Sequence, residues 1–266
     1  MDCLQCRMQL YATDMDIIQN FYNSLASQYD KLFLNWESST REQAVILNRI
    51  FNQYGFDNTA HILDCACGIG TQAIGLASMG YRVTASDISD NELTEAQKRA
   101  EKNGVQIRFE HADFCALEKT FSEPFDIVIA MDNALPHMLS SADLEKAVRS
   151  MTSQTRPGGI FVASIRDYDA LLAEKPRYSA PYIHKTEKGQ RVSFQTWQWN
   201  NDIYHLIQYI IDDEDSLQIS KFECDYRALR RVELANCLLS CGCCEVVWMF
   251  PEKTGFYQPI VVARKQ

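Results

Sequence analysis

The sequence contains no long apolar run. Nowhere in its 266 residues do about 18 apolar side chains follow one another, which is the length that a helix needs to cross a bilayer. The opening segment, MDCLQCRMQLYATDMD, carries acidic residues where a secretory signal needs a basic start and an apolar stretch. We therefore expect a soluble, cytoplasmic protein with no membrane partner.

An excess of positive charge is missing as well. Lys and Arg number 26 against 35 Asp and Glu, which gives a formal net charge of −9. Proteins that follow a phosphate backbone present a basic patch or stripe. We therefore expect no nucleic-acid partner and look for the substrate among small molecules.

The ten cysteines lack the paired spacing of a zinc site. The densest group, CLLSCGCCEVV, contains Cys237, Cys241, Cys243 and Cys244. Its intervals are not those of two Cys-x-x-Cys knuckles, and they suit free thiols at the end of a buried helix and the start of a strand. Cys3 and Cys6 form one Cys-x-x-Cys without a second pair nearby, so we expect that pair to be inert. We expect no metal.

Short β-rich runs alternate with helical patterns between residues 61 and 165. The runs are HILDCA, YRVTASD, VQIRFEHAD, FDIVIAM and GIFVASI, and helices are expected over residues 71–79, 90–103 and 142–155. This alternation predicts an α/β fold with a mostly parallel sheet covered by helices on both faces. Glycines and proline mark the expected element ends at Gly80, at Asn103 and Gly104, and at Pro157, Gly158 and Gly159.

The pattern changes after Ile165. Three strand-like runs, QRVSFQTWQWN, DIYHLIQYIID and SLQISKFECDY, follow with short polar turns between them, which predicts a small antiparallel insert. A helix over about residues 227–240 and a hairpin of CEVVWMF and FYQPIVVARK then return to the main sheet. We expect residues 1–166 and 227–266 to form the core and residues 167–226 to form an insert over the substrate cavity.

The region before the sheet looks helical and aromatic. Residues 15–55 are expected to form N-terminal helices that cap the core, with Ser39 and Thr40 as the N-cap of one of them.

The stretch HILDCACGIGTQ, residues 61–72, points to a ligand. A strand that ends in Asp64 gives way to a turn in which Gly68 and Gly70 let a ligand approach the backbone. Ligands of open α/β sheets bind at the carboxyl ends of the strands. Such a turn is a weak signal by itself, because a strand-to-helix turn without a ligand has the same residues.

Asp87 strengthens this interpretation. It ends YRVTASD about twenty residues after the turn, where a carboxylate accepts both ribose hydroxyls of an adenosine. A helix-capping aspartate is the alternative. The third glycine of a dinucleotide motif is missing, since Ala73 follows Gly70, Thr71 and Gln72. The turn therefore favours S-adenosylmethionine, whose ammonium Asp64 can approach, and an NAD oxidoreductase is the weaker alternative.

At this point the sequence resembles the class I S-adenosylmethionine-dependent methyltransferases, through this turn and through EHADF, FDIVIAM and RPGGIFVASI. Segments outside that core resemble the glycine/sarcosine N-methyltransferases: FYNSLASQYDKLFLNWESSTREQA, MDNALPHM, SIRDYDAL, VSFQTWQW and KTGFYQPIVVARK. The resemblance implies a Rossmann-like fold and N-methylation of glycine, sarcosine or both, as in betaine biosynthesis. A methyltransferase for another small carboxylate or amine, or a non-catalytic S-adenosylmethionine-binding protein, stays open, and the sequence does not indicate the oligomeric state.

The resemblance also implies the site residues. Around the cofactor it places Tyr22, Trp36, Arg41, Asp64, Ala66, Gly68, Gly70, Asp87, Asp113, Phe114, Met131 and His137. Around the amino-acid substrate it places Asn133, Arg166, Tyr168, Tyr209 and Tyr226. Arg41 closes over the cofactor carboxylate and Arg166 grips the substrate carboxylate by a two-pronged contact. Asn133 and Tyr209 orient the acceptor, and we expect His137 to be a wall of the pocket rather than a base.

Two residues depart from the family. Asp132 stands where the family often has glycine, and it brings a charge near the sulfonium that either alters acceptor orientation or turns away. Phe33 stands where the animal branch presents a tyrosine, so a hydroxyl is absent at that place.

Overall fold

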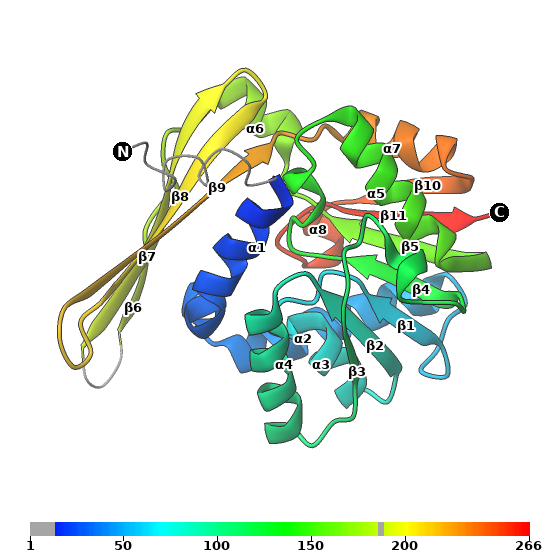
Figure 1. The fold of residues 1–266 in the computed structure, drawn as a ribbon, viewed down its shortest axis with the longest axis horizontal. Coiled ribbons are helices and arrows are strands. Elements are labelled where there is room, and N and C mark those ends of the chain that lie inside the picture. Colours follow the sequence, from blue (N-terminus) through cyan, green and yellow to red (C-terminus); the bar gives the residue numbers. More distant parts are fainter. Residues whose placement is uncertain (1–13, 186–188) are drawn as a thin grey trace, which may run out of the picture.

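A seven-stranded sheet forms the centre of the molecule (Figure 1). The computed structural model describes residues 14–185 and 189–266, so Cys3 and Cys6 lie outside the described residues. The strands are β1 His61–Asp64, β2 Arg82–Asp87, β3 Arg108–His111, β4 Phe125–Ala130, β5 Thr155–Ser164, β10 Cys243–Met249 and β11 Ile260–Lys265. They lie in the order β10, β11, β5, β4, β1, β2, β3. Neighbours among β1 to β5 are parallel, whereas β11 is antiparallel to both β5 and β10, which confirms the predicted sheet and its closing hairpin.

Alternate side chains of the central strands enter different hydrophobic clusters on the two faces of the sheet. Ile127 and Ile129 of β4 pack in one cluster with α2 Trp36–Gln53 and α3 Thr71–Ser78. Val128 packs in the other cluster with α5 Ser141–Ser153 and α7 Arg231–Ser240. This period of two follows from the pleat, and it explains why the strands read as continuous apolar runs.

The N-terminal segment forms three helices rather than one continuous helix. They are α1 Asp14–Leu25, the 3-10 helix η2 Ala26–Leu32 and α2. The N-cap of α2 is Asn35, whose side chain accepts a hydrogen bond from the amide of Ser38 at 2.8 Å. The predicted cap at Ser39 and Thr40 is therefore wrong, because both residues lie inside the helix that Asn35 begins.

A second, four-stranded antiparallel sheet stands beside the main one (Figure 1). It consists of β6 Tyr182–Lys185, β7 Gln190–Asn200, β8 Ile203–Asp212 and β9 Gln218–Arg227. Three of these strands were predicted, and the short β6 was missed. Tyr204 and Leu206 of β8 and Phe222 of β9 pack in the same cluster as α5. Helix α1 contacts both β9 and α4 Asp90–Lys102, so it connects the second sheet with the main one.

Several predicted boundaries move by a few residues. Pro157, Gly158 and Gly159 lie inside β5, where its register with β4 shifts. Helix α7 begins at Arg231, because residues up to Arg227 belong to β9. The predicted loop PEKTG contains the short helix α8 Pro251–Thr254, and α6 Tyr168–Glu174, η3 Leu117–Lys119 and η4 Leu135–His137 complete the fold.

The described part of the chain has no helix that is long and apolar enough to cross a membrane. Its eight cysteines are free thiols, and Cys237, Cys241, Cys243 and Cys244 lie around the end of α7 and the start of β10. No group of three or more His, Cys, Asp or Glu within the described ranges is placed to hold a metal ion.

Candidate active site

A pocket of about 620 Å³, part of it open to solvent, lies at the carboxyl ends of the central strands. The strand order reverses here, since β1 has β2 on one side and β4 on the other. Eight of the residues predicted to bind the cofactor line this pocket: Tyr22, Ala66, Gly68, Asp87, Asp113, Phe114, Met131 and His137.

Asp87 connects the strand-to-helix turn with the next strand. One of its carboxylate oxygens accepts from the amide of Gly68 at 2.8 Å, and the other accepts from the amide of Ser89 at 2.9 Å. Burial raises the pKa of Asp87, and these amides oppose that rise. Each oxygen can accept a further bond. The N-cap of α4 is Ser89, so helix capping does not account for Asp87.

Gly70 shapes the turn without lining the pocket. It is the N-cap of α3 with φ 89°, and a Cβ there would lie 2.8 Å from Cδ1 of Ile74. Both the backbone conformation and the space therefore require glycine.

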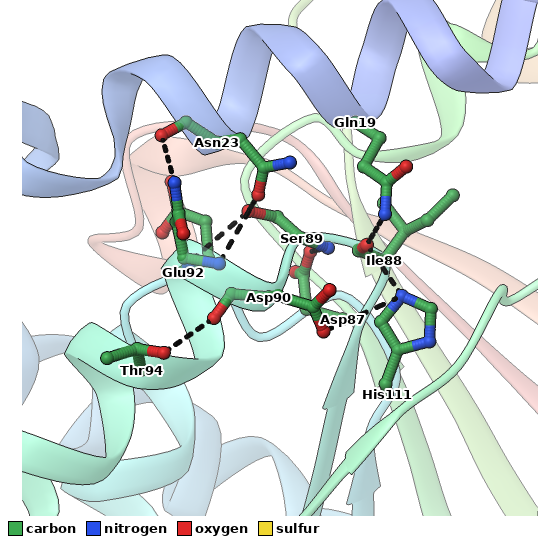
Figure 2. Close-up of polar contacts among 10 residues, drawn as sticks. Gln19, Asn23, Asp87, Ile88, Ser89, Asp90, Glu92, Thr94 and His111 are labelled. Carbon is green, nitrogen blue, oxygen red and sulfur yellow. Dashed lines mark hydrogen bonds and ion pairs between the residues drawn. The ribbon is translucent and has the colours of Figure 1, made fainter.

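Helix α1 holds the loop after β2 from above (Figure 2). Gln19 donates to the carbonyl of Ile88 at 2.8 Å, and the side-chain oxygen of Asn23 accepts from the hydroxyl of Ser89 at 2.7 Å. From the opposite side, the imidazole of His111 bonds the same Ile88 carbonyl at 2.9 Å. Because Ile88 lines the pocket beside Asp87, these contacts fix the wall nearest the expected ribose. Sequence reasoning missed Gln19, which lies outside every quoted motif, and Asn23, which lies in the segment FYNSLASQYDKLFLNWESSTREQA but was given no role.

Asp113 and Phe114 form the far end of the pocket, after β3. One carboxylate oxygen of Asp113 accepts from the amide of Cys115 at 2.7 Å, which leaves the other oxygen available to a donor such as an amino group.

Three other predicted cofactor residues lie outside the pocket lining. Trp36 is buried, donates to the hydroxyl of Thr71 at 3.0 Å and belongs to a small separate hydrophobic cluster. Arg41 is exposed and bonds the hydroxyl of Ser38 at 3.2 Å. Asp64 is fully buried, and burial raises its pKa to about 8 although the backbone amides of Ala66 and Ala73 oppose the rise. Tyr29, which sequence reasoning did not assign to the site, lines the pocket instead.

A second group of side chains lies around Arg166, just after β5. The guanidinium donates to the hydroxyl of Tyr204 at 3.2 Å and to the side-chain oxygen of Gln195 at 3.0 Å. The Tyr168 hydroxyl donates to the side-chain oxygen of Asn133 at 3.0 Å, and it bonds the Tyr204 hydroxyl at 2.9 Å. The structure thus brings Asn133, Arg166 and Tyr168 together as expected, although their binding role stays a prediction.

Tyr209 does not belong to this group. Along β8, Tyr204 and Leu206 face the core, whereas Tyr209 faces the other side of the sheet and stacks on Phe194 at 5.0 Å between ring centroids. The expectation that Tyr209 lies beside Asn133 and Arg166 is therefore wrong. Tyr204 on the same strand occupies that place.

Tyr226 joins the Arg166 group to the pocket. Its ring stacks on Tyr204 with 5.7 Å between centroids, and it lies 4.2 Å from the ring of His137. Its hydroxyl lies 3.5 Å from that of Tyr22, a pocket residue. The cofactor pocket and the Arg166 group are therefore two parts of one site.

His137 is placed as a neutral wall. Its Nε2 lies 2.8 Å from the Tyr22 hydroxyl, and burial lowers its pKa to about 3. A group that stays neutral at physiological pH and is hydrogen-bonded to a tyrosine suits the expected role as a wall.

The protein family follows from the part of the chain that builds this pocket. The methyltransferase domain family matches residues 62–159, from β1 into β5. The chain carries a methyltransferase domain. A relative of this domain, the glycine/sarcosine N-methyltransferase of Aphanothece halophytica, is 28% identical over 180 residues, which cover 66% of this chain and 66% of that protein. The match spans between 53% and 66% of the length of the first curated relatives.

Solved structures share the fold of this methyltransferase domain. An S-adenosylmethionine-dependent methyltransferase from Clostridium acetobutylicum has a TM-score of 0.73 at 18% identity, covering 92% of this chain and 98% of that one. An amino pentose methyltransferase from Micromonospora echinaspora, solved with S-adenosylmethionine bound, has a TM-score of 0.70 at 16% identity, covering 86% and 92%.

The residues present fit the cofactor of this methyltransferase domain, S-adenosylmethionine. Asp87 and Asp113 offer carboxylate oxygens to a ribose and an adenine amino group, and Phe114 offers a ring face beside the latter. When bound, the cofactor supplies an electrophilic methyl group.

Proposed function

We propose that the protein transfers a methyl group from S-adenosylmethionine to the nitrogen of glycine, sarcosine or both. The observation that carries this proposal is that N–H donors of Arg166 and Asn133 lack partners. The Arg166 guanidinium forms no ion pair with a carboxylate among the residues described, and its side-chain hydrogen bonds go only to neutral groups, Tyr204 and Gln195. Nδ2 of Asn133 is buried and has no acceptor.

The guanidinium lacks an anionic partner and the amide nitrogen lacks an acceptor, so one anion can satisfy both groups. A guanidinium has five N–H donors, so three remain after these two hydrogen bonds. A carboxylate matches the planar fork of arginine and accepts from an amide at the same time. A small amino acid held in this way has its nitrogen near the wall that Tyr226 shares with the cofactor pocket.

Methyl transfer to a nitrogen requires few further groups from the protein. The acceptor nitrogen must be neutral when it attacks the methyl group, and burial together with a nearby positive charge lowers the pKa of an ammonium. Alignment in a cavity that excludes water then accounts for most of the rate. A strong general base is unnecessary, which agrees with a His137 that stays neutral.

The names of the curated relatives support the same acceptor. Several are glycine/sarcosine N-methyltransferases or glycine N-methyltransferases, and successive methylation of glycine nitrogen leads to betaine. We place the protein in that type of reaction sequence, with a small-molecule amino acid as its substrate.

The test measures S-adenosylhomocysteine release with glycine, sarcosine, dimethylglycine and a panel of amines that lack a carboxylate. Products are resolved by mass. We expect turnover with glycine or sarcosine and none with methylamine. Turnover limited to amines without a carboxylate would assign another acceptor class, and S-adenosylmethionine binding without any turnover would indicate a binding protein.

A further inference from the structure

Asp132 and Asn133 follow β4 with an unusual backbone. Both have positive φ, 55° and 72°, a conformation that costs most side chains energy although Asp and Asn tolerate it. Two bonds to one residue of β5 fix it: the amide of Asp132 donates to the hydroxyl of Ser164 at 2.8 Å, and the amide of Asn133 donates to its carbonyl at 3.1 Å. Glycine would adopt φ 55° without strain. Asp132 therefore occupies a position at which the backbone conformation favours a residue without a side chain.

Asp132 is a lining residue of the methyl-donor pocket, together with Met131 and Ala134. It accepts from the Tyr257 hydroxyl at 2.7 Å and from the side-chain amide of Gln72 at 2.8 Å. Both donors are neutral, and no cation of the described chain pairs with it. Burial raises the pKa of Asp132, while its two hydrogen bonds oppose this rise. A half-buried carboxylate with spare lone pairs and no charged partner is matched best by a cation.

The neighbouring side chain, Asn133, belongs to the Arg166 group. Its oxygen accepts from the amide of Arg166 at 3.1 Å and from the Tyr168 hydroxyl. Two adjacent residues therefore belong to the two parts of the site. Asp132 lines the cofactor pocket, and Asn133 belongs to the Arg166 group, which lacks an anionic partner. An α-amino acid carries its opposite charges only one carbon apart, so their binding groups must be close neighbours.

We infer that Asp132 binds the ammonium of the amino-acid acceptor while Arg166 binds its carboxylate. Asp132 thereby selects a zwitterion over a simple carboxylate and directs its nitrogen toward the methyl-donor pocket, and the ammonium gives a proton to this carboxylate before the neutral nitrogen attacks the methyl group. This inference rests on the proposed function. Glycine, which is common in the family at this position, has no side chain that could bind an ammonium. Of the two alternatives for Asp132, the inference favours a role in acceptor orientation, because Asp132 is a lining residue of the pocket.

The test compares binding of glycine and of acetate, which keeps the carboxylate and lacks the ammonium. Both are titrated by NMR into the protein saturated with S-adenosylhomocysteine, so no turnover occurs. In Asp132→Asn, which tolerates the same backbone, we expect glycine affinity to fall about tenfold or more, with acetate affinity unchanged or higher. Asp132→Gly should behave in the same way, whereas Arg166→Lys should weaken both ligands.

Equal changes for glycine and acetate in Asp132→Asn would overturn the inference. So would a loss of S-adenosylhomocysteine affinity with the preference for glycine intact, because that result would assign Asp132 to the cofactor's ammonium. The proposed function fails differently: the parent protein would then neither bind nor methylate glycine or sarcosine. Thermal unfolding of each variant shows that the fold is retained.

Discussion

The hydroxyl of Tyr204 accepts a hydrogen bond from Nη1 of Arg166 at 3.2 Å, whereas Tyr209 of the same strand stacks on Phe194 across the sheet. The two tyrosines are five positions apart, and an odd interval places side chains on opposite faces of a strand. Tyr204→Phe should therefore lower kcat/KM for the acceptor about tenfold, through loss of one charge-assisted hydrogen bond.

Tyr209→Phe is the matched control. We expect its kcat/KM for the acceptor to stay within about twofold of the parent, since its hydroxyl contacts nothing in the site, and a surface change of this kind has little effect. Steady-state kinetics with glycine or sarcosine varied decide the matter. A large effect of Tyr209→Phe with none of Tyr204→Phe would restore Tyr209 to the acceptor site.

This pair shows where sequence reasoning ends. The main sheet, the glycine turn and Asp87 were predictable, because hydrophobic periodicity and a short motif are local signals. Which tyrosine of β8 faces Arg166 depends on the parity of that strand against a packed core, and a resemblance that is shifted by an odd number of residues selects the wrong face. Trp36 shows the same difficulty, because the sequence pattern of a buried aromatic residue is the same whether the residue lines a pocket or packs beneath a helix.

Asp87 should control cofactor affinity. Asp87→Ala removes the carboxylate expected to accept the ribose hydroxyls and frees the amides of Gly68 and Ser89. We expect S-adenosylmethionine affinity to fall by on the order of 1.5–3 kcal/mol for each lost charge-assisted bond, measured by calorimetry. Asp90→Ala, three residues on and exposed, is the control and should bind as the parent does. Equal affinity of Asp87→Ala and parent would remove Asp87 from the site.

Asp64 should make stability depend on pH. Its pKa is raised from 3.8 to about 8 in the folded protein, so the folded state keeps a proton that the unfolded state has lost between about pH 4 and pH 8. Stability from this group is complete below about pH 4 and is lost as pH rises toward 8, with a slope of about 1.4 kcal/mol per pH unit. Denaturant unfolding at several pH values should show a shallower slope for Asp64→Asn. Parallel curves for parent and variant would mean that Asp64 ionises normally.

The imidazole of His137 should remain neutral. Burial lowers its pKa to about 3, so its ring signals in NMR should not titrate between pH 5 and pH 8. The pH profile of kcat should then owe nothing to His137. A midpoint near pH 6.5 for this ring would contradict the neutral wall and reopen a role as base.

The central claim is that Arg166 holds the carboxylate of an amino-acid acceptor, and Arg166→Lys tests it most directly. Lysine keeps the charge and loses the planar fork, so the acceptor can swing. Misplacing the nitrogen by about an ångström costs on the order of a hundredfold in rate. We predict that fall in kcat/KM for glycine or sarcosine, with S-adenosylmethionine affinity little changed. Arg231→Lys, whose parent guanidinium already pairs with Asp167 and Asp169, should leave the rate unaltered. Parent-level methylation by both Arg166→Lys and Arg166→Ala would contradict the carboxylate site.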